Sequence, residues 1–220
     1  MMPRLRYDKN GNCIGSHTML FDEIPDDYVV DSIFLNGKFG DLSSLGMFKH
    51  LKGYYADKPL KKYDLGIEFQ NEEWFRSEIF MGLSLDYLNS ARYLWKAIDE
   101  ERGKDIVSYY LIPCTYLCKH SIELMLKRCL LAKGITEFKG HSVKKLWDKL
   151  EEKQLPHYLE LSSFIDEVEQ IDSNEMALRY GLDNGFKLLP SDLYYDIDKI
   201  IANAMFLFNI VDEHIIWKYR

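Results

Sequence analysis

The spacing of apolar residues changes near residue 72, and this change constrains the fold more than any other feature of the chain. Before it, Gly, Pro, Asp and Asn interrupt short apolar runs. After it, apolar residues recur every three or four positions, the spacing of one face of an α-helix. The sequence therefore predicts a mainly α protein, an up-and-down helical bundle of about five helices with a small N-terminal strand and loop region.

Local signals give approximate ends for these helices. Asn71 can cap the first, and Gly134 follows the second, which contains Pro113. The expected helices cover about 72–100, 105–133, 142–152, 157–171 and 191–218. The last has two apolar stripes, more than one buried face requires. It is either the central helix of the bundle or, in part, a two-fold dimer contact.

The N-terminal region has a different pattern. Residues 8–12 (Asp-Lys-Asn-Gly-Asn) are a hairpin-turn signal, and the runs 28–30 and 32–35 are short enough to be strands. This region is too short for a core of its own, so we expect it to pack against the helices. The predicted organisation is a small unit at 1–72 and the helical bundle at 73–220.

The composition indicates the class of protein and the cellular compartment. The chain has 220 residues, 47% hydrophobic and 29% charged, as in a single globular domain. Three of its four cysteines fall in one helical stretch rather than in loops, which favours a reducing compartment. No signal peptide is readable at the start, and the most apolar window, 200–211, is shorter than the roughly 20 residues of a membrane span. We therefore expect a cytoplasmic protein without a membrane partner.

The common catalytic motifs are missing. The sequence has no Gly-rich phosphate loop, dinucleotide fingerprint, His-Glu-x-x-His, Cys-x-x-Cys or Gly-x-Ser-x-Gly. Cys114 with Cys118 and His120 with Glu123 are helical neighbours, but no second cluster completes a metal site. We expect no metal and no cofactor, core cysteines, and a His120–Glu123 hydrogen bond on the helix surface or between subunits.

Charge is unevenly distributed in a chain whose net charge is −7. Residues 119–149, which include Lys127 and Arg128, carry five more cations than anions, whereas residues 151–175 carry seven more anions than cations. Such blocks are either solvated helix faces or, for the basic one, a local attraction for phosphates. In the basic block, His141 precedes Ser142, which can cap a helix. The first-turn amides with Lys144 and Lys145 form either a simple capped turn or an anion site.

A second polar group, Arg179 with Tyr180, precedes the last helix. An arginine beside an aromatic residue suits contact with phosphate, carboxylate or a stacked base. The alternative is an ion pair with the preceding acidic helix.

These segments resemble the HEPN superfamily (higher eukaryote and prokaryote nucleotide-binding). The resemblance covers about 73–218 and is carried by HSIELMLKRCLL at 120–131, Lys133-Gly134, Gly140-His141-Ser142 and Arg179-Tyr180. It implies an all-α bundle that is frequently a dimer. Members include metal-independent endoribonucleases of toxin-antitoxin, abortive-infection and phage-defence systems, and noncatalytic members that bind RNA or nucleotides.

Active members of that family carry an Arg followed, four to six residues later, by a His. Arg179 stands at the place of the Arg, but positions 184–186 are Asn, Gly and Phe. The resemblance thus implies a divergent member, a homodimer that binds RNA or a nucleotide. The candidate catalytic residues are Arg179 and His141, and the candidate ligand-binding residues are Lys127, Arg128, Lys144, Lys145 and Tyr180. The alternative is a noncatalytic module that docks another protein on its apolar terminal helix and acidic block.

Overall fold

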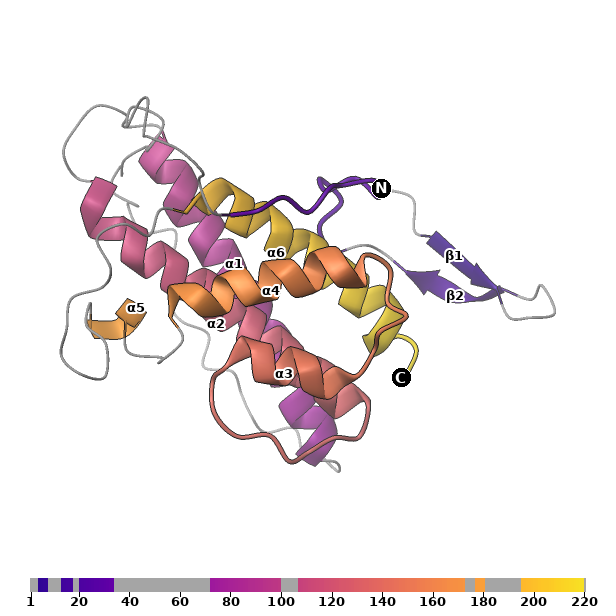
Figure 1. The fold of residues 1–220 in the computed structure, drawn as a ribbon. Coiled ribbons are helices and arrows are strands. Elements are labelled where there is room, and N and C mark those ends of the chain that lie inside the picture. The colour runs from indigo at the N-terminus through magenta and orange to yellow at the C-terminus, as the bar shows by residue number, and fades with distance from the viewer. Residues whose placement is uncertain are drawn as a thin grey trace, which may run out of the picture.

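The computed structural model describes residues 4–7, 13–17, 20–33, 72–99, 107–172, 177–180 and 195–219, and in these ranges the chain is mainly helical (Figure 1). The helices are α1 (Glu72–Asp99), α2 (Val107–Ala132), α3 (Val143–Leu150), α4 (Tyr158–Ile171), the short α5 (Ala177–Tyr180) and α6 (Ile197–Val211), which continues as the π-helix η2 (Asp212–Ile216). The helices with eight or more residues correspond to the five that the apolar spacing predicts, so the fold class is confirmed. The largest difference in position is the start of α6, which lies a few residues later than predicted.

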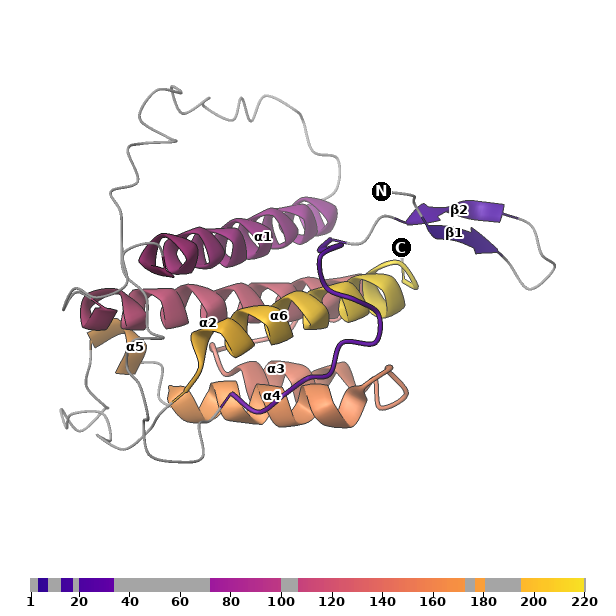
Figure 2. The same cartoon turned by 90° about the horizontal axis from the view of Figure 1, so that it is seen from above.

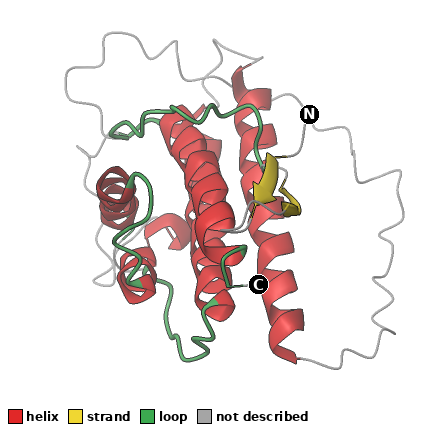
Figure 3. Cartoon of the chain, turned by 90° about the vertical axis from the view of Figure 1, so that its right-hand side faces the viewer, coloured by secondary structure: helices red, strands yellow, loops and turns green. Residues whose placement is uncertain are grey.

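The helices are arranged around α2 and α6. Figure 2 shows α1 on one side of this pair and α3 with α4 on the other. The described loops lie on the outside of the helical body (Figure 3). No described helix combines the length and the apolar character that a membrane span requires.

The helix ends follow local rules. The Ser142 side chain caps α3 by accepting a hydrogen bond from the backbone N–H of Lys145, as predicted. Gly140, just before this cap, has a φ of +81°, in the left-handed region that glycine adopts without strain. The turn from α2 into α3 is therefore determined by a glycine and a capping serine that are adjacent to His141.

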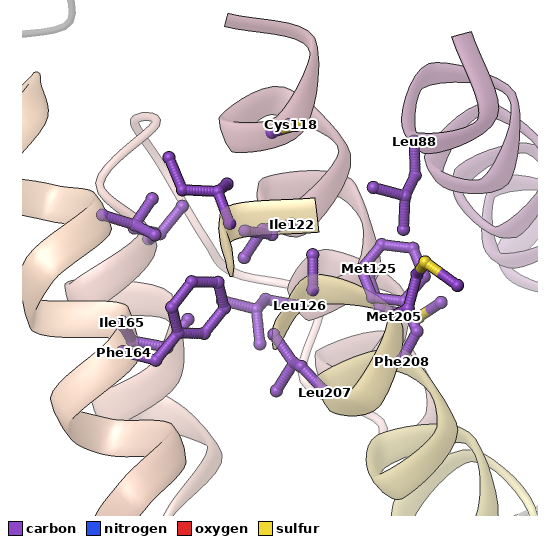
Figure 4. Packing of buried hydrophobic residues seen from close by; sticks show 14 of the residues in the cluster. Leu88, Cys118, Ile122, Met125, Leu126, Phe164, Ile165, Met205, Leu207 and Phe208 are labelled. Atoms are coloured by element: carbon purple, nitrogen blue, oxygen red, sulfur yellow. The ribbon is translucent and has the colours of Figure 1, made fainter. Parts of the chain in front are cut away.

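α6 is the central helix of the bundle, and most of its side chains are buried. Figure 4 shows Leu207 and Phe208 among side chains from α1, α2 and α4. One apolar stripe is buried throughout and consists of Ile197, Ile201, Ala204, Phe208, Val211 and Ile215. In the second stripe, Ile200 and Leu207 are buried, and Ile210 and Trp217 are half-buried. The wide apolar surface of α6 is thus covered within the chain. Of the two alternatives, the structure shows the central helix of the bundle.

Residues 20–33 form an irregular strap that runs along α6 (Figure 2). The side-chain amide of Asn209 accepts a hydrogen bond from the Phe21 N–H and donates one to the Phe21 carbonyl. Asn203 accepts from the Tyr28 hydroxyl at 2.6 Å and donates to the Asp31 carbonyl at 2.7 Å. Two asparagines of an otherwise apolar helix therefore bind the strap to the bundle.

The predicted strands at 28–30 and 32–35 are wrong over their described residues, 28–33. The backbone N–H of Ile33 donates to Glu167 of α4, and its carbonyl accepts from Asp196. This segment thus pairs with the helices instead of with a strand. The hairpin signal at residues 8–12 agrees with the structure, because strands β1 (Arg4–Tyr7) and β2 (Cys13–His17) on either side of it pair antiparallel. Residues 8–12 themselves lie outside the described residues.

Candidate functional site

A buried carboxylate on α2 is the centre of the candidate site. Glu123 is 3% exposed and its two oxygens contact three cationic or ionisable side chains. Oε1 lies 2.9 Å from Nδ1 of His141 and 2.5 Å from Nζ of Lys127, and Oε2 lies 3.2 Å from Nδ1 of His120. The Glu123 carboxylate therefore contacts both imidazoles, and in each ring the contacting atom is Nδ1.

These contacts determine the ionisation of Glu123. Burial by itself raises the pKa of this carboxyl, because the charged form loses hydration. The hydrogen bonds from His120, Lys127 and His141, together with the charge of Lys127, outweigh burial and lower the pKa from 4.5 to about 2. Glu123 is thus an anion at neutral pH.

A small pocket opens beside this cluster. It is lined by Tyr116, Lys119, His120, Glu123, His141, Asp172 and Arg179. Its interior volume is about 10 Å³, about the room that one water molecule needs. The His141 side chain is 42% exposed and that of His120 is 19% exposed, so both imidazoles reach solvent above the buried carboxylate.

Aromatic rings fix the position of His120 and Arg179. His120 stacks on Tyr116 with an angle of 7° between the ring planes, and it meets Tyr87 of α1 edge-on at 4.7 Å. The guanidinium of Arg179 lies 5.7 Å from the centre of the Tyr116 ring. Arg179 is exposed, and this cation–π contact with Tyr116 places its charge beside the pocket.

Lys119 connects the pocket to the end of α4. Its ammonium donates to the Asp172 carbonyl and lies 3.6 Å from the Asp172 carboxylate. Both side chains are less than 10% exposed. This pair joins α2 to Asp172 at the end of α4.

The local sequence explains how these groups meet. Residues 116, 119, 120, 123 and 127 are three or four positions apart and share one face of α2. His141 comes from the loop between α2 and α3, directly before the Ser142 cap, and Arg179 comes from α5. Three elements therefore contribute to one site.

The predicted catalytic residues Arg179 and His141 line the same pocket. Lys127 does not line the pocket but pairs with Glu123, which does. Arg128 is buried, 5% exposed, and does not line the pocket. Tyr180 lies in α5, but its side chain is outside the described residues. Positions 184–186, after Arg179, are also outside them.

The predicted anion site at the start of α3 has partners within the chain. The Lys144 ammonium pairs with Asp148 at 2.5 Å and Asp166 at 3.5 Å, and its backbone N–H lies 3.4 Å from a Glu169 oxygen. The Lys145 N–H binds the Ser142 hydroxyl. Lys144 and Lys145 do not line the pocket that contains His141.

Sequence reasoning missed the central role of Glu123, and also Tyr116, Lys119 and Asp172. The spacing of His120 and Glu123 predicted their hydrogen bond correctly, but placed it at a helix surface or between subunits. The sequence signal for this role is the spacing of Glu123, which lies three positions after His120 and four before Lys127, so that both side chains can face its carboxylate.

The described cysteines lie in the core and do not line this pocket. Cys114, Cys118 and Cys129 are buried free thiols of the core stripe, as expected. Burial raises the pKa of Cys129, so this thiol stays protonated. Among the residues that the structure describes, no group of three or more His, Cys, Asp and Glu side chains is arranged to hold a metal ion.

Comparison with known proteins gives one match. Residues 109–214 match the HEPN domain family. No curated protein and no solved structure matches the chain. The matched range begins in α2, ends in η2 and includes every residue that lines the pocket. This match supports membership of residues 109–214 in the HEPN superfamily.

Proposed function

We propose that this protein binds RNA by placing a backbone phosphate against the pocket formed by His120, His141 and Arg179. The observation that carries this proposal is the convergence of an exposed guanidinium and two partly exposed imidazoles around the buried Glu123. Arginine and protonated histidine are both strong donors to phosphate oxygens.

The size of the pocket favours a polymer over a free nucleotide. Sites that enclose small ligands usually have volumes of about 300–1,000 Å³. The interior here is about 10 Å³, so base and sugar would remain outside it. A phosphodiester can contact such a site from the surface while the rest of the strand lies along the protein.

Charge makes this binding dependent on salt. The fixed charges that line the pocket cancel, with Lys119 and Arg179 opposite Glu123 and Asp172. Lys127 adds one cation behind Glu123. Binding that depends on the charge of Arg179 should therefore weaken as the salt concentration rises.

Fluorescence anisotropy with a labelled single-stranded RNA tests this proposal. Arg179→Ala should weaken binding about tenfold, since a charged hydrogen bond contributes about 1.5 kcal/mol or more. Lys153→Ala is the matched control, because it removes an exposed cation outside the pocket. Equal weakening by both variants, or by neither, would refute the site. A mononucleotide that binds as tightly as the RNA would refute the choice of a polymer.

The setting that the family resemblance implies is a phage-defence or toxin-antitoxin system, with the protein acting as a homodimer. Both belong to this proposal. Sedimentation velocity across a range of concentrations measures the oligomeric state.

A second function, docking of another protein, has a specific observation in its favour. The face of α1 that points outward exposes Ile79 (39%), Leu83 (40%) and Tyr93 (67%). The apolar face of α6, on which docking was first expected, is buried within the chain. Purification of the intact protein separates the two functions. Bound nucleic acid supports RNA binding, and a stoichiometric protein that is lost with Leu83→Lys supports docking.

A further inference from the structure

We infer that a groove between the α3–α4 loop and the C-terminal segment binds a free amino acid through its ammonium and its carboxylate. The groove is lined by residues 151–156 of the loop, by His214 of η2 and by Lys218. Its volume is about 380 Å³, within the roughly 300–1,000 Å³ of sites that hold small molecules. It shares no lining residue with the pocket around Glu123, so this inference goes beyond the proposed RNA binding.

Glu152 joins the two walls of the groove. Its carboxylate lies 2.9 Å from Nζ of Lys133, just after α2, and 3.4 Å from Nζ of Lys218. It also accepts a hydrogen bond of 2.7 Å from the Tyr219 hydroxyl. These contacts hold the loop and the C-terminal segment together, so the groove is formed before a ligand arrives. They also pair Glu152 and Lys218 within the chain.

Glu151 is a residue whose conformation and contacts within the chain do not explain it. It caps the end of α3 with a φ of +53°, in the left-handed region. Glycine adopts this conformation without strain, whereas a side chain makes it costly. The Glu151 side chain is exposed, lines the groove, and forms no hydrogen bond or ion pair with the residues that the structure describes. The cost of this glutamate is therefore not offset within the described chain.

Lys153, two positions later, carries the opposite charge. It is the only Lys or Arg between residues 151 and 175, a segment with eight acidic side chains. Its ammonium nevertheless pairs with no carboxylate among the described residues, and it lines the same groove. Gln154 beside it adds an amide that can both donate and accept a hydrogen bond. The groove thus offers one anion and one cation that are left for a ligand.

These two charges determine the class of ligand. A simple anion would be attracted by Lys153 but repelled by Glu151, and a simple cation would meet the reverse. A zwitterion with one ammonium and one carboxylate satisfies both side chains. Leu155 and Pro156 also line the groove and provide apolar contact for a side chain. We therefore expect an amino acid with an apolar side chain, and L-leucine is the probe.

NMR titration of the intact, ¹⁵N-labelled protein tests this inference. L-Leucine should shift the backbone amide signals of residues 151–156. N-acetyl-L-leucine lacks the ammonium and L-leucinamide lacks the carboxylate, so each loses one charged contact. Each should therefore bind about tenfold more weakly than L-leucine.

Two variants test the residues. Glu151→Gly and Lys153→Ala should each weaken L-leucine binding about tenfold. Glu151→Gly should not lower the free energy of unfolding in urea, because glycine adopts the left-handed conformation without strain. Glu160→Gln, exposed on α4 and outside the groove, is the matched control and should bind like the parent.

Three results would overturn the inference: no shift of these signals with L-leucine, equal binding of the three probes, or unchanged binding by both variants. Each would leave the proposed RNA binding as it is, because that depends on another pocket. Conversely, Arg179→Ala should lose RNA binding and still bind L-leucine like the parent. The two proposals can therefore fail separately.

Discussion

Replacement of Glu123 by glutamine tests whether this carboxylate is ionised in the folded protein as its contacts require. Its side chain is 4% exposed and touches Lys127, His120 and His141. The substitution keeps the shape of the side chain and an oxygen acceptor, but it removes the negative charge. The substitution creates no cavity, so the change in the free energy of unfolding measures the effect of the charge on this carboxyl.

The magnitude follows from the pKa. The carboxyl has a pKa of 4.5 in its ordinary state and of about 2 in the folded protein. Each pH unit between these values corresponds to about 1.4 kcal/mol. Ionisation of Glu123 therefore contributes about 3 kcal/mol to the free energy of unfolding. Because the folded-state pKa is the lower one, this contribution is complete above pH 4.5 and is lost as the pH falls toward 2.

Urea unfolding at several pH values measures this directly. Glu123→Gln should be about 3 kcal/mol less stable than the parent at pH 7 and at pH 5.5, and the difference should shrink at lower pH by about 1.4 kcal/mol per unit. Glu137→Gln, in the exposed loop before α3, is the matched control and should change stability by less than about 0.5 kcal/mol. A pH-independent difference, or none at pH 7, would refute the reasoning.

Three further predictions concern the fold. Asn209→Ala should lower the free energy of unfolding by about 2 kcal/mol in urea, since the buried N–H and carbonyl of Phe21 lose their partner; a loss below about 0.5 kcal/mol would contradict this role. Phe208→Ala should cost about 4 kcal/mol by the same measurement, because the ring is fully buried at the centre of the bundle, and a loss below 2 kcal/mol would not fit. Burial raises the pKa of Cys129, so iodoacetamide at pH 8 should label it in urea but not in the native protein, as mass spectrometry can check.

The helices could be predicted because their signals are local. Apolar spacing, the Ser142 cap and the glycine after α2 each depend on residues within about four positions of one another. The structure confirms the five long helices and shows why α6 has two apolar stripes, since it is buried on several sides. Asn203 and Asn209 looked like interruptions of that helix, whereas they bind the strap, a contact between residues more than 170 positions apart.

The site could be predicted only in part, for the same reason. The local sequence pairs His120 with Glu123 and Lys127, and Arg179 was recognised by its place before the last helix. That His141 reaches Glu123 depends on how the loop after α2 returns to that helix, which no periodic pattern encodes. Lys144, only three positions further along, turns instead to Asp148 and Asp166.

The cost of the buried carboxylate indicates what this site is for. An apolar side chain of similar size is often as stabilising as a buried ion pair, so stability alone does not require a glutamate at 123. A cluster that served only to stabilise the bundle would also bury its imidazoles, but the His141 side chain is 42% exposed. Burial of the carboxylate with exposure of the rings is the arrangement expected when the anion orients two groups for a ligand. Glu123 is therefore better explained as a residue that orients His120 and His141 toward a ligand, as the proposed function requires, than as a residue that only stabilises the bundle.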